Sequence, residues 1–86
     1  EELTLESLDI YPNPAFGWVN VNYNLPENTS SVISVISLTG EILYQLDIDS
    51  KDRVEESIPL FDFSAGIYLV EIEIDKQKFY RRLSIK

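Results

Sequence analysis

The clearest structural signal in the chain is the run GIYLVEIEIDKQKFYRRLSI, residues 66–85. From Tyr68 to Ile74 an apolar side chain occupies every second position, which is the period of a β-strand with one buried face. A short polar turn, Asp75-Lys76-Gln77, leads into a last strand on which Phe79, Leu83 and Ile85 share a face with Arg81. We therefore expect an antiparallel hairpin that begins in a tight bend at Gly66, with the Tyr68 ring turned toward the core.

Five earlier segments carry strand signals of the same kind, and no window shows a clean helical period. They are residues 7–11, 18–25, 31–38, 42–48 and 53–58. The segments are separated by turn residues: Pro12-Asn13-Pro14, Pro26-Glu27-Asn28, a hairpin in which Gly40 takes a left-handed conformation, and the polar loop 49–52. About seven short strands in a chain of 86 residues predict an immunoglobulin-like antiparallel β-sandwich.

The length and composition fit one domain, because 86 residues with 44% hydrophobic content leave no room for a second core. We expect residues 1–86 to form that domain, with residues 1–5 as the remnant of a linker. The chain has no run of about 18 apolar residues that could span a bilayer. It lacks an initial methionine, so we interpret it as a piece of a longer protein.

The distribution of charge separates one end of the chain from the rest. The net charge is −8, which argues against a general nucleic-acid binder. All 15 acidic residues lie within residues 1–75, whereas five of the seven basic residues fall in the last eleven: Lys76, Lys78, Arg81, Arg82 and Lys86. Two interpretations remain open for these cations, namely cross-strand pairing with Glu71 and Glu73 or an exposed basic patch that orients the domain on a partner.

The residue types exclude most catalytic chemistry. Without histidine or cysteine, neither an imidazole-activated hydrolase nor a thiolate site can form. The spacing of Asp47, Asp49 and Asp52 could supply oxygen ligands to calcium, but the glycine and closing glutamate of a calcium loop are missing. The carboxylate pairs Glu55-Glu56 and Glu71/Glu73 fit outward-facing strand positions better than a glycosidase cleft. We expect no enzymatic activity, no metal and no cofactor.

Aromatic side chains offer a second kind of site. A flat group of them could stack on sugars, as in carbohydrate-binding sandwiches, and core packing is the other interpretation. The candidates are Tyr11, Phe16, Trp18, Tyr44, Phe61 and Tyr80. Because we place these rings mainly at core-facing positions, we expect no measurable affinity for common polysaccharides.

An ordered set of motifs carries a family resemblance over residues 8–86. The set comprises LDIYPNP at 8–14, WVNV at 18–21, Leu25-Pro26, ISLTG at 36–40, FSAGIY at 63–68 and RRLSIK at 81–86. In this order and spacing it resembles the C-terminal sorting domain of the type IX (Por) secretion system of Bacteroidetes. Two positions depart from the family pattern, since Ser37 stands where Asp or Asn is common and Glu41 where a basic residue is frequent.

This resemblance implies a secretion signal with no catalytic role. It implies an N-terminally attached cargo, transit through the periplasm, guidance through an outer-membrane translocon with a barrel-shaped shuttle protein, cleavage before the domain by a sortase, and a cargo that is secreted or left at the cell surface. The residues expected to form the sorting motif are Pro12, Asn13, Pro14, Gly40, Gly66, Tyr68, Arg81, Arg82 and Lys86. The alternative function is a fibronectin-like or carbohydrate-binding accessory module of an extracellular enzyme.

Overall fold

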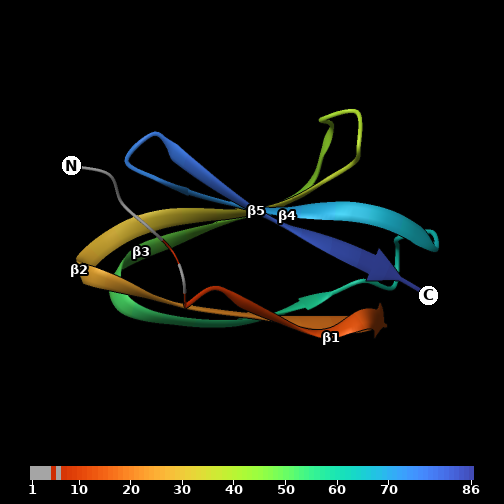
Figure 1. Cartoon of the computed structure of the whole chain (residues 1–86), viewed down its shortest axis with the longest axis horizontal. Helices are drawn as coiled ribbons and strands as arrows, with labels where there is room; N and C mark the ends of the chain where they lie inside the picture. The colour runs from red at the N-terminus through yellow and green to blue at the C-terminus, as the bar shows by residue number, and fades with distance from the viewer. Residues whose placement is uncertain (1–4, 6) are drawn as a thin grey trace.

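The computed structural model describes residue 5 and residues 7–86, apart from the side chains of residues 26–28. Over this part of the chain the structure is all-β (Figure 1), and no helix is long and apolar enough to cross a membrane. The strands are β1 (Asp9–Phe16), β2 (Trp18–Ile36), β3 (Ile42–Pro59), β4 (Gly66–Ile74) and β5 (Gln77–Ile85).

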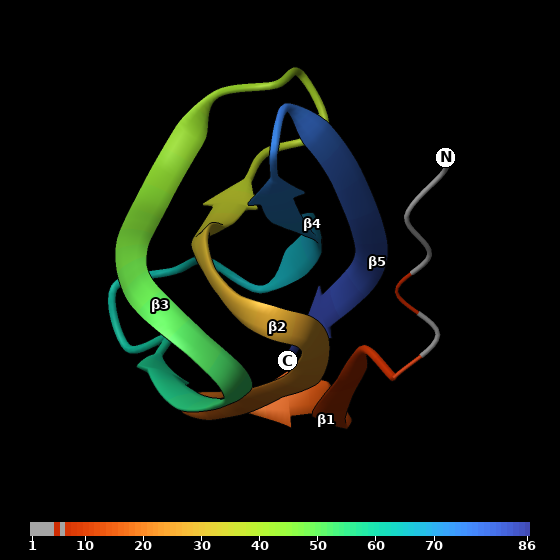
Figure 2. The same ribbon diagram turned by 90° about the vertical axis from the view of Figure 1, so that its left-hand side faces the viewer.

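The strands form a sheet that closes on itself. Their order is β1-β5-β4-β2-β3, with an additional pairing between β1 and β2, so four of them make a circuit and β3 lies outside β2. Figure 2 shows this circuit end-on. The pairings are antiparallel except that between β1 and β5, which is parallel.

Two long strands pass from one layer of the fold to the other. Residues 18–24 of β2 lie between β1 and the second half of β3, whereas residues 31–36 lie between β4 and the first half of β3. The register of β2 against β3 shifts between Asn24 and Thr29, around Pro26, which has no N–H for the ladder. The architecture is therefore sandwich-like, with corners made by bent strands that serve both layers.

The predicted all-β sandwich is confirmed, but the expected strand boundaries differ in three places. Residues 26–28 and 49–52, which we took for strand ends, are bends inside β2 and β3, so two long strands replace four short ones. Pro12-Asn13-Pro14 likewise lies inside β1, with cis bonds at both prolines, and interrupts the β1–β2 register between Tyr11 and Phe16. In each case the turn residues form a bend within a longer strand and do not end it.

The core lies between the two layers. The inward face of each strand is apolar, as the alternation predicted, with Val19, Val21 and Tyr23 on β2 opposite Val70, Ile72 and Ile74 on β4. Leu5 and Leu8, ahead of β1, are also buried in this cluster. Each buried side-chain nitrogen or oxygen of the described residues has a hydrogen-bond partner.

Two turns contain residues with positive φ, and the sequence predicted one of these conformations, that of Gly40. Gly40, in the loop between β2 and β3, has a φ of +93°, which confirms its predicted left-handed conformation. The turn between β4 and β5 has positive φ at both central residues, +50° at Asp75 and +68° at Lys76. Positive φ at both positions matches the type I′ hairpin turn, whose twist fits that of the flanking strands.

Candidate functional site

The C-terminal strand, β5, lies between an antiparallel neighbour, β4, and a parallel one, β1. Along one edge β5 pairs with β4 over its whole length, from Gln77 opposite Ile74 to Ile85 opposite Gly66. Along the other edge its end meets β1, where Ala15 is the partner of Ile85. The Lys86 N–H donates to the Ala15 carbonyl at 2.9 Å.

The side chain of Asn13 extends this contact between β1 and β5. Its Nδ2 donates to the Arg82 carbonyl at 2.8 Å, and its Oδ1 accepts from the Ser84 N–H at 2.9 Å. Two segments that the sequence singled out, Pro12-Asn13-Pro14 and the basic C-terminus, are therefore in direct contact although about 70 residues separate them. We call this contact the β1–β5 seam.

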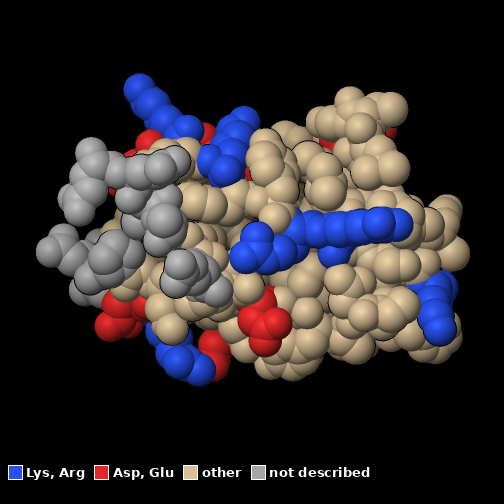
Figure 3. Space-filling model, viewed as in Figure 1, with Lys and Arg blue, Asp and Glu red and all other residues tan. Residues whose placement is uncertain are grey.

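Basic side chains lie along β5 from the β4–β5 turn toward the C-terminus. Arg81, Arg82 and Lys86 are all exposed, and in Figure 3 basic groups run along β5 toward its C-terminal end. Arg81 shares the core-facing side of the strand, as predicted, and its guanidinium donates to the Tyr80 carbonyl at 3.0 Å. Arg82 lies on the opposite side of the strand from Arg81, because side chains alternate along a strand.

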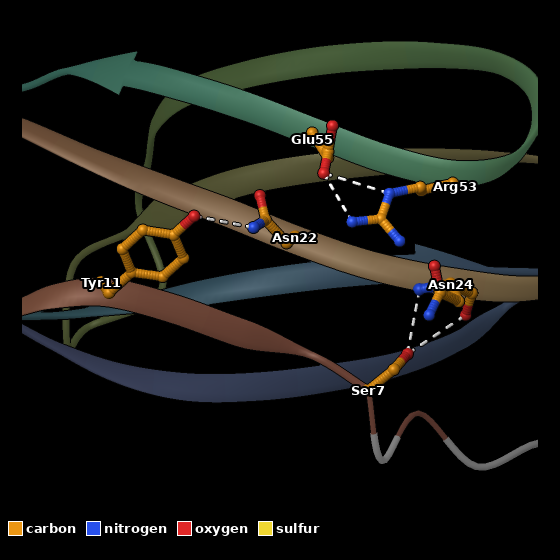
Figure 4. A network of polar contacts seen from close by, with 6 residues as sticks. All are labelled: Ser7, Tyr11, Asn22, Asn24, Arg53 and Glu55. Atoms are coloured by element: carbon orange, nitrogen blue, oxygen red, sulfur yellow. Dashed lines mark hydrogen bonds and ion pairs between the residues drawn. The ribbon is translucent and has the colours of Figure 1, made fainter.

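Cross-strand pairing with acidic residues, one of the two interpretations of these cations, is wrong. The described residues contain one ion pair, between Arg53 and Glu55 on β3, at 2.7 Å (Figure 4). Glu73 does lie opposite Lys78 in the ladder, but the two form no ion pair within 4.0 Å. The partner of Glu71 is Tyr80, and a hydrogen bond to the Glu71 carboxylate raises the pKa of the Tyr80 phenol. The guanidinium groups and ammonium groups of the strand are thus available to an external partner.

The remaining residues of the expected motif lie in two places. Gly66 begins β4 directly opposite Ile85, so it borders the seam. Tyr68 is half-buried against the core, its ring edge-on to Phe63 at 5.4 Å and its hydroxyl donating to the Ser64 carbonyl at 2.6 Å. Gly40 belongs to the loop between β2 and β3, which Figures 1 and 2 place at the top of the molecule, with β1 at the bottom. The structure therefore brings Pro12, Asn13, Pro14, Gly66, Arg82 and Lys86 together and leaves Gly40 apart.

Five of the six candidate aromatic rings lie where core packing would not put them. Tyr44 packs against the core, but the core interpretation is wrong for the five others, whose exposed fractions are 45% (Tyr11), 82% (Phe16), 48% (Trp18), 69% (Phe61) and 44% (Tyr80). Trp18 and Phe61 contact each other with centroids 5.4 Å apart and planes at 89°, so this pair forms no flat platform for a sugar ring. Phe16, Trp18 and Phe61 lie at the turn between β1 and β2. Trp18 is out of phase with the buried Val19, Val21 and Tyr23, and the core interpretation overlooked this signal.

Acidic residues gather at a hollow near the β4–β5 turn, lined by Asp47, Asp49, Glu73 and Asp75 together with Lys76. In the described part of the chain no group of three or more carboxylates is arranged to hold a metal ion. Asp47 and Asp49 are exposed and line this hollow together with Lys76.

These features define a small all-β domain that presents a strand rich in exposed basic side chains. The chain belongs to the family of secretion system C-terminal sorting domains, whose sequence profile matches residues 9–86. Members of this family are the sorting signals of type IX secretion. The chain accordingly directs an attached cargo through the type IX machinery, toward the outer membrane or cell surface. The family is not a catalytic one. No curated protein matches the chain.

Proposed function

We propose that the exposed basic side chains of β5 and of Lys86 directly after it, above all Arg81, Arg82 and Lys86, form the part of this sorting domain that the type IX machinery binds. The observation that supports this most strongly is electrostatic. Five cations occupy the last eleven residues of a chain with net charge −8, and they have no ion-pair partner among the described residues. A row of basic side chains on an otherwise acidic domain can orient a binding partner as it approaches and fix its position along the strand.

Membership of the family supports the following partners for the domain. The first is a barrel-shaped outer-membrane shuttle protein that takes the domain from the periplasm to the translocon. A sortase then cleaves the chain ahead of the domain, and the cargo is released or attached at the cell surface. We place the domain boundary before Leu5, whose side chain belongs to the core, so that residues 1–4 belong to the linker. The domain itself acts only by binding and performs no catalysis.

A double substitution tests this proposal. Arg82→Ala with Lys86→Ala should leave the thermal midpoint within a few degrees of the parent, because exposed charges contribute only about 0 to 1 kcal/mol to stability. Export of a fused periplasmic reporter in a type IX-competent host should fall toward the level of a translocon-deficient strain.

The matched control is Lys76→Ala with Lys78→Ala, which removes the same charge at the other end of the same hairpin. It should be exported like the parent. Normal export of the folded Arg82/Lys86 variant would exclude the basic end of β5 from the signal.

A further inference from the structure

We propose that Asn13 is a positioning residue for the sorting strand: its side-chain amide takes the place of a β-strand residue beside β5 and fixes the segment that carries Arg82 and Lys86. This inference rests on the proposed function, in which those two cations are bound by the export machinery. It gives the Pro-Asn-Pro motif a role that acts through the strand and needs no contact with the partner.

The hydrogen bonds of Asn13 reproduce a parallel β-ladder. In a parallel pair, the N–H of a residue donates to the carbonyl of the residue that precedes its partner. The carbonyl of the same residue accepts from the N–H of the residue that follows its partner. The Asn13 amide does the same around Leu83, because it donates to the carbonyl of Arg82 and accepts from the N–H of Ser84. Two residues further on, the backbone of Ala15 continues the pattern around Ile85. The side chain therefore extends the parallel ladder by one step.

The flanking prolines explain why a side chain takes this role. In a regular parallel ladder the backbone of residue 13 would itself pair with Leu83, two residues before the pair of Ala15 and Ile85. Around Pro12 and Pro14, however, the register of β1 is irregular, and its backbone pairing with β5 is recorded at Ala15 alone. An asparagine side chain carries one amide donor and one amide acceptor, the same pair as a peptide group. At this point of β1 the side-chain amide of Asn13 supplies the donor and the acceptor that a regular strand would supply from its backbone.

The position of the two bonds links them to the sorting residues. Arg82 is itself the acceptor residue, and Ser84 lies between Arg82 and Lys86 on the same side of the strand. Without the amide, the edge of β5 that faces β1 keeps only the step at Ala15 and Ile85. The end of β5 could then splay from β1 while its pairing with β4 persists, and the two cations would lose their fixed spacing relative to the fold.

Amide hydrogen exchange of the full chain tests the contact directly. Asn13→Ala should speed exchange of the Ser84 N–H about tenfold or more, because that amide loses its acceptor. The N–H groups of Arg81 and Leu83 face β4 and provide an internal reference. The matched control is Asn22→Ala, which removes a side-chain hydrogen bond to the Tyr11 hydroxyl between β2 and β1, on the other side of β1 from β5 (Figure 4). Unchanged protection of Ser84 in Asn13→Ala would overturn the proposal.

A second variant separates positioning from general loss of stability. The ionised carboxylate of Asn13→Asp can only accept hydrogen bonds, so near neutral pH it repels the Arg82 carbonyl and the Ser84 amide should exchange faster. When protonated, its O–H can donate to that carbonyl while its other oxygen accepts from Ser84. The protection factor of Ser84 should therefore recover as the pH falls through the pKa of the introduced carboxyl, because only the protonated form can donate to the Arg82 carbonyl. Asn13→Ala should show no such recovery.

Export completes the test. Asn13→Ala and Asn13→Asp should each lower export of a fused reporter at least about fivefold with thermal midpoints near that of the parent, whereas Asn22→Ala should be exported normally. Normal export of an Asn13 variant that has lost Ser84 protection would show that the contact is only structural. Failure of the Arg82/Lys86 variant to affect export would instead remove the proposed function, while the hydrogen-exchange result would still stand.

Discussion

At the scale of single residues, one buried hydroxyl pair joins the two halves of β2. The Tyr23 and Ser31 side chains lie on either side of the bend, with their oxygens 2.6 Å apart, and their exposed fractions are 2% and 3%. Burial raises the pKa of the Tyr23 phenol, and the nearby Glu56 carboxylate adds to this, although the hydrogen bond with Ser31 works in the other direction. Folding therefore favours the neutral form of the Tyr23 phenol.

Alkaline unfolding should reveal this pair. Since the pKa of Tyr23 is higher in the folded than in the unfolded chain, its contribution to stability is complete below about pH 10 and is lost as pH rises through the folded value. Tyr23→Phe should weaken that decline and cost about 1 to 2 kcal/mol at pH 7, because the Ser31 hydroxyl loses its partner. Urea unfolding at pH 7 and above pH 10 measures both effects. Tyr11→Phe, which removes an exposed hydroxyl, is the control, and an alkaline slope unchanged by Tyr23→Phe would contradict the assignment.

The direction of a side chain was predictable from the sequence where it depends on the alternation along a strand. The inward position of Tyr23 follows from the pattern of residues 18–25, but its partner Ser31 lies beyond a bend whose register no local pattern gives. The amide contacts of Asn13 were hidden for the same reason, since they depend on the distant C-terminus. An asparagine between two prolines was the available signal, because the prolines interrupt regular strand pairing and the asparagine side chain can replace a peptide group.

At the scale of elements, the β4–β5 hairpin is where sequence and structure agree most closely. Its alternation, its polar turn and its register are all local properties, so the sequence contains them. The residues at its turn nevertheless carry a cost, because Asp75 and Lys76 hold positive φ without being glycine. A side chain in the left-handed region costs about 1 to 2 kcal/mol relative to the right-handed one.

Lys76→Gly should therefore stabilise the domain. A type I′ turn favours glycine at its second central position, and removing the strained side chain should gain about 0.5 to 1 kcal/mol, which for a domain of this size raises the thermal midpoint by several degrees. Calorimetry in about 0.15 M salt measures the change with the lost charge partly screened. Lys51→Gly removes the same charge from β3 at a residue without positive φ and should destabilise the domain. A midpoint for Lys76→Gly at or below the parent would contradict this account.

At the scale of the whole molecule, the bends in β2 and β3 couple the two layers. The sequence places turn residues at 26–28 and 49–52, and a turn between strands and a bend within one strand use the same residue types. Which of the two occurs depends on long-range pairing: the edge of β2 that meets β1 in its first half meets β4 in its second. This explains why the all-β class was predictable and the number of strands was not.

Because β2 belongs to both layers, the domain should unfold as one unit. Ile72 is fully buried on β4, in one layer, whereas Trp18, the sole tryptophan, lies at the start of β2 in the other. Ile72→Val should cost about 0.5 to 1.5 kcal/mol by removing one buried methyl group. If the layers are coupled, the denaturation midpoint from Trp18 fluorescence must fall by the same amount as the midpoint from far-ultraviolet circular dichroism, since coincident transitions are the mark of a two-state change.

Lys51→Ala, on the exposed corner of β3, should move neither signal appreciably. A Trp18 transition that stays at the parental midpoint while the dichroism transition shifts would show that the layers unfold separately, and that the bent strands do not transmit stability between them.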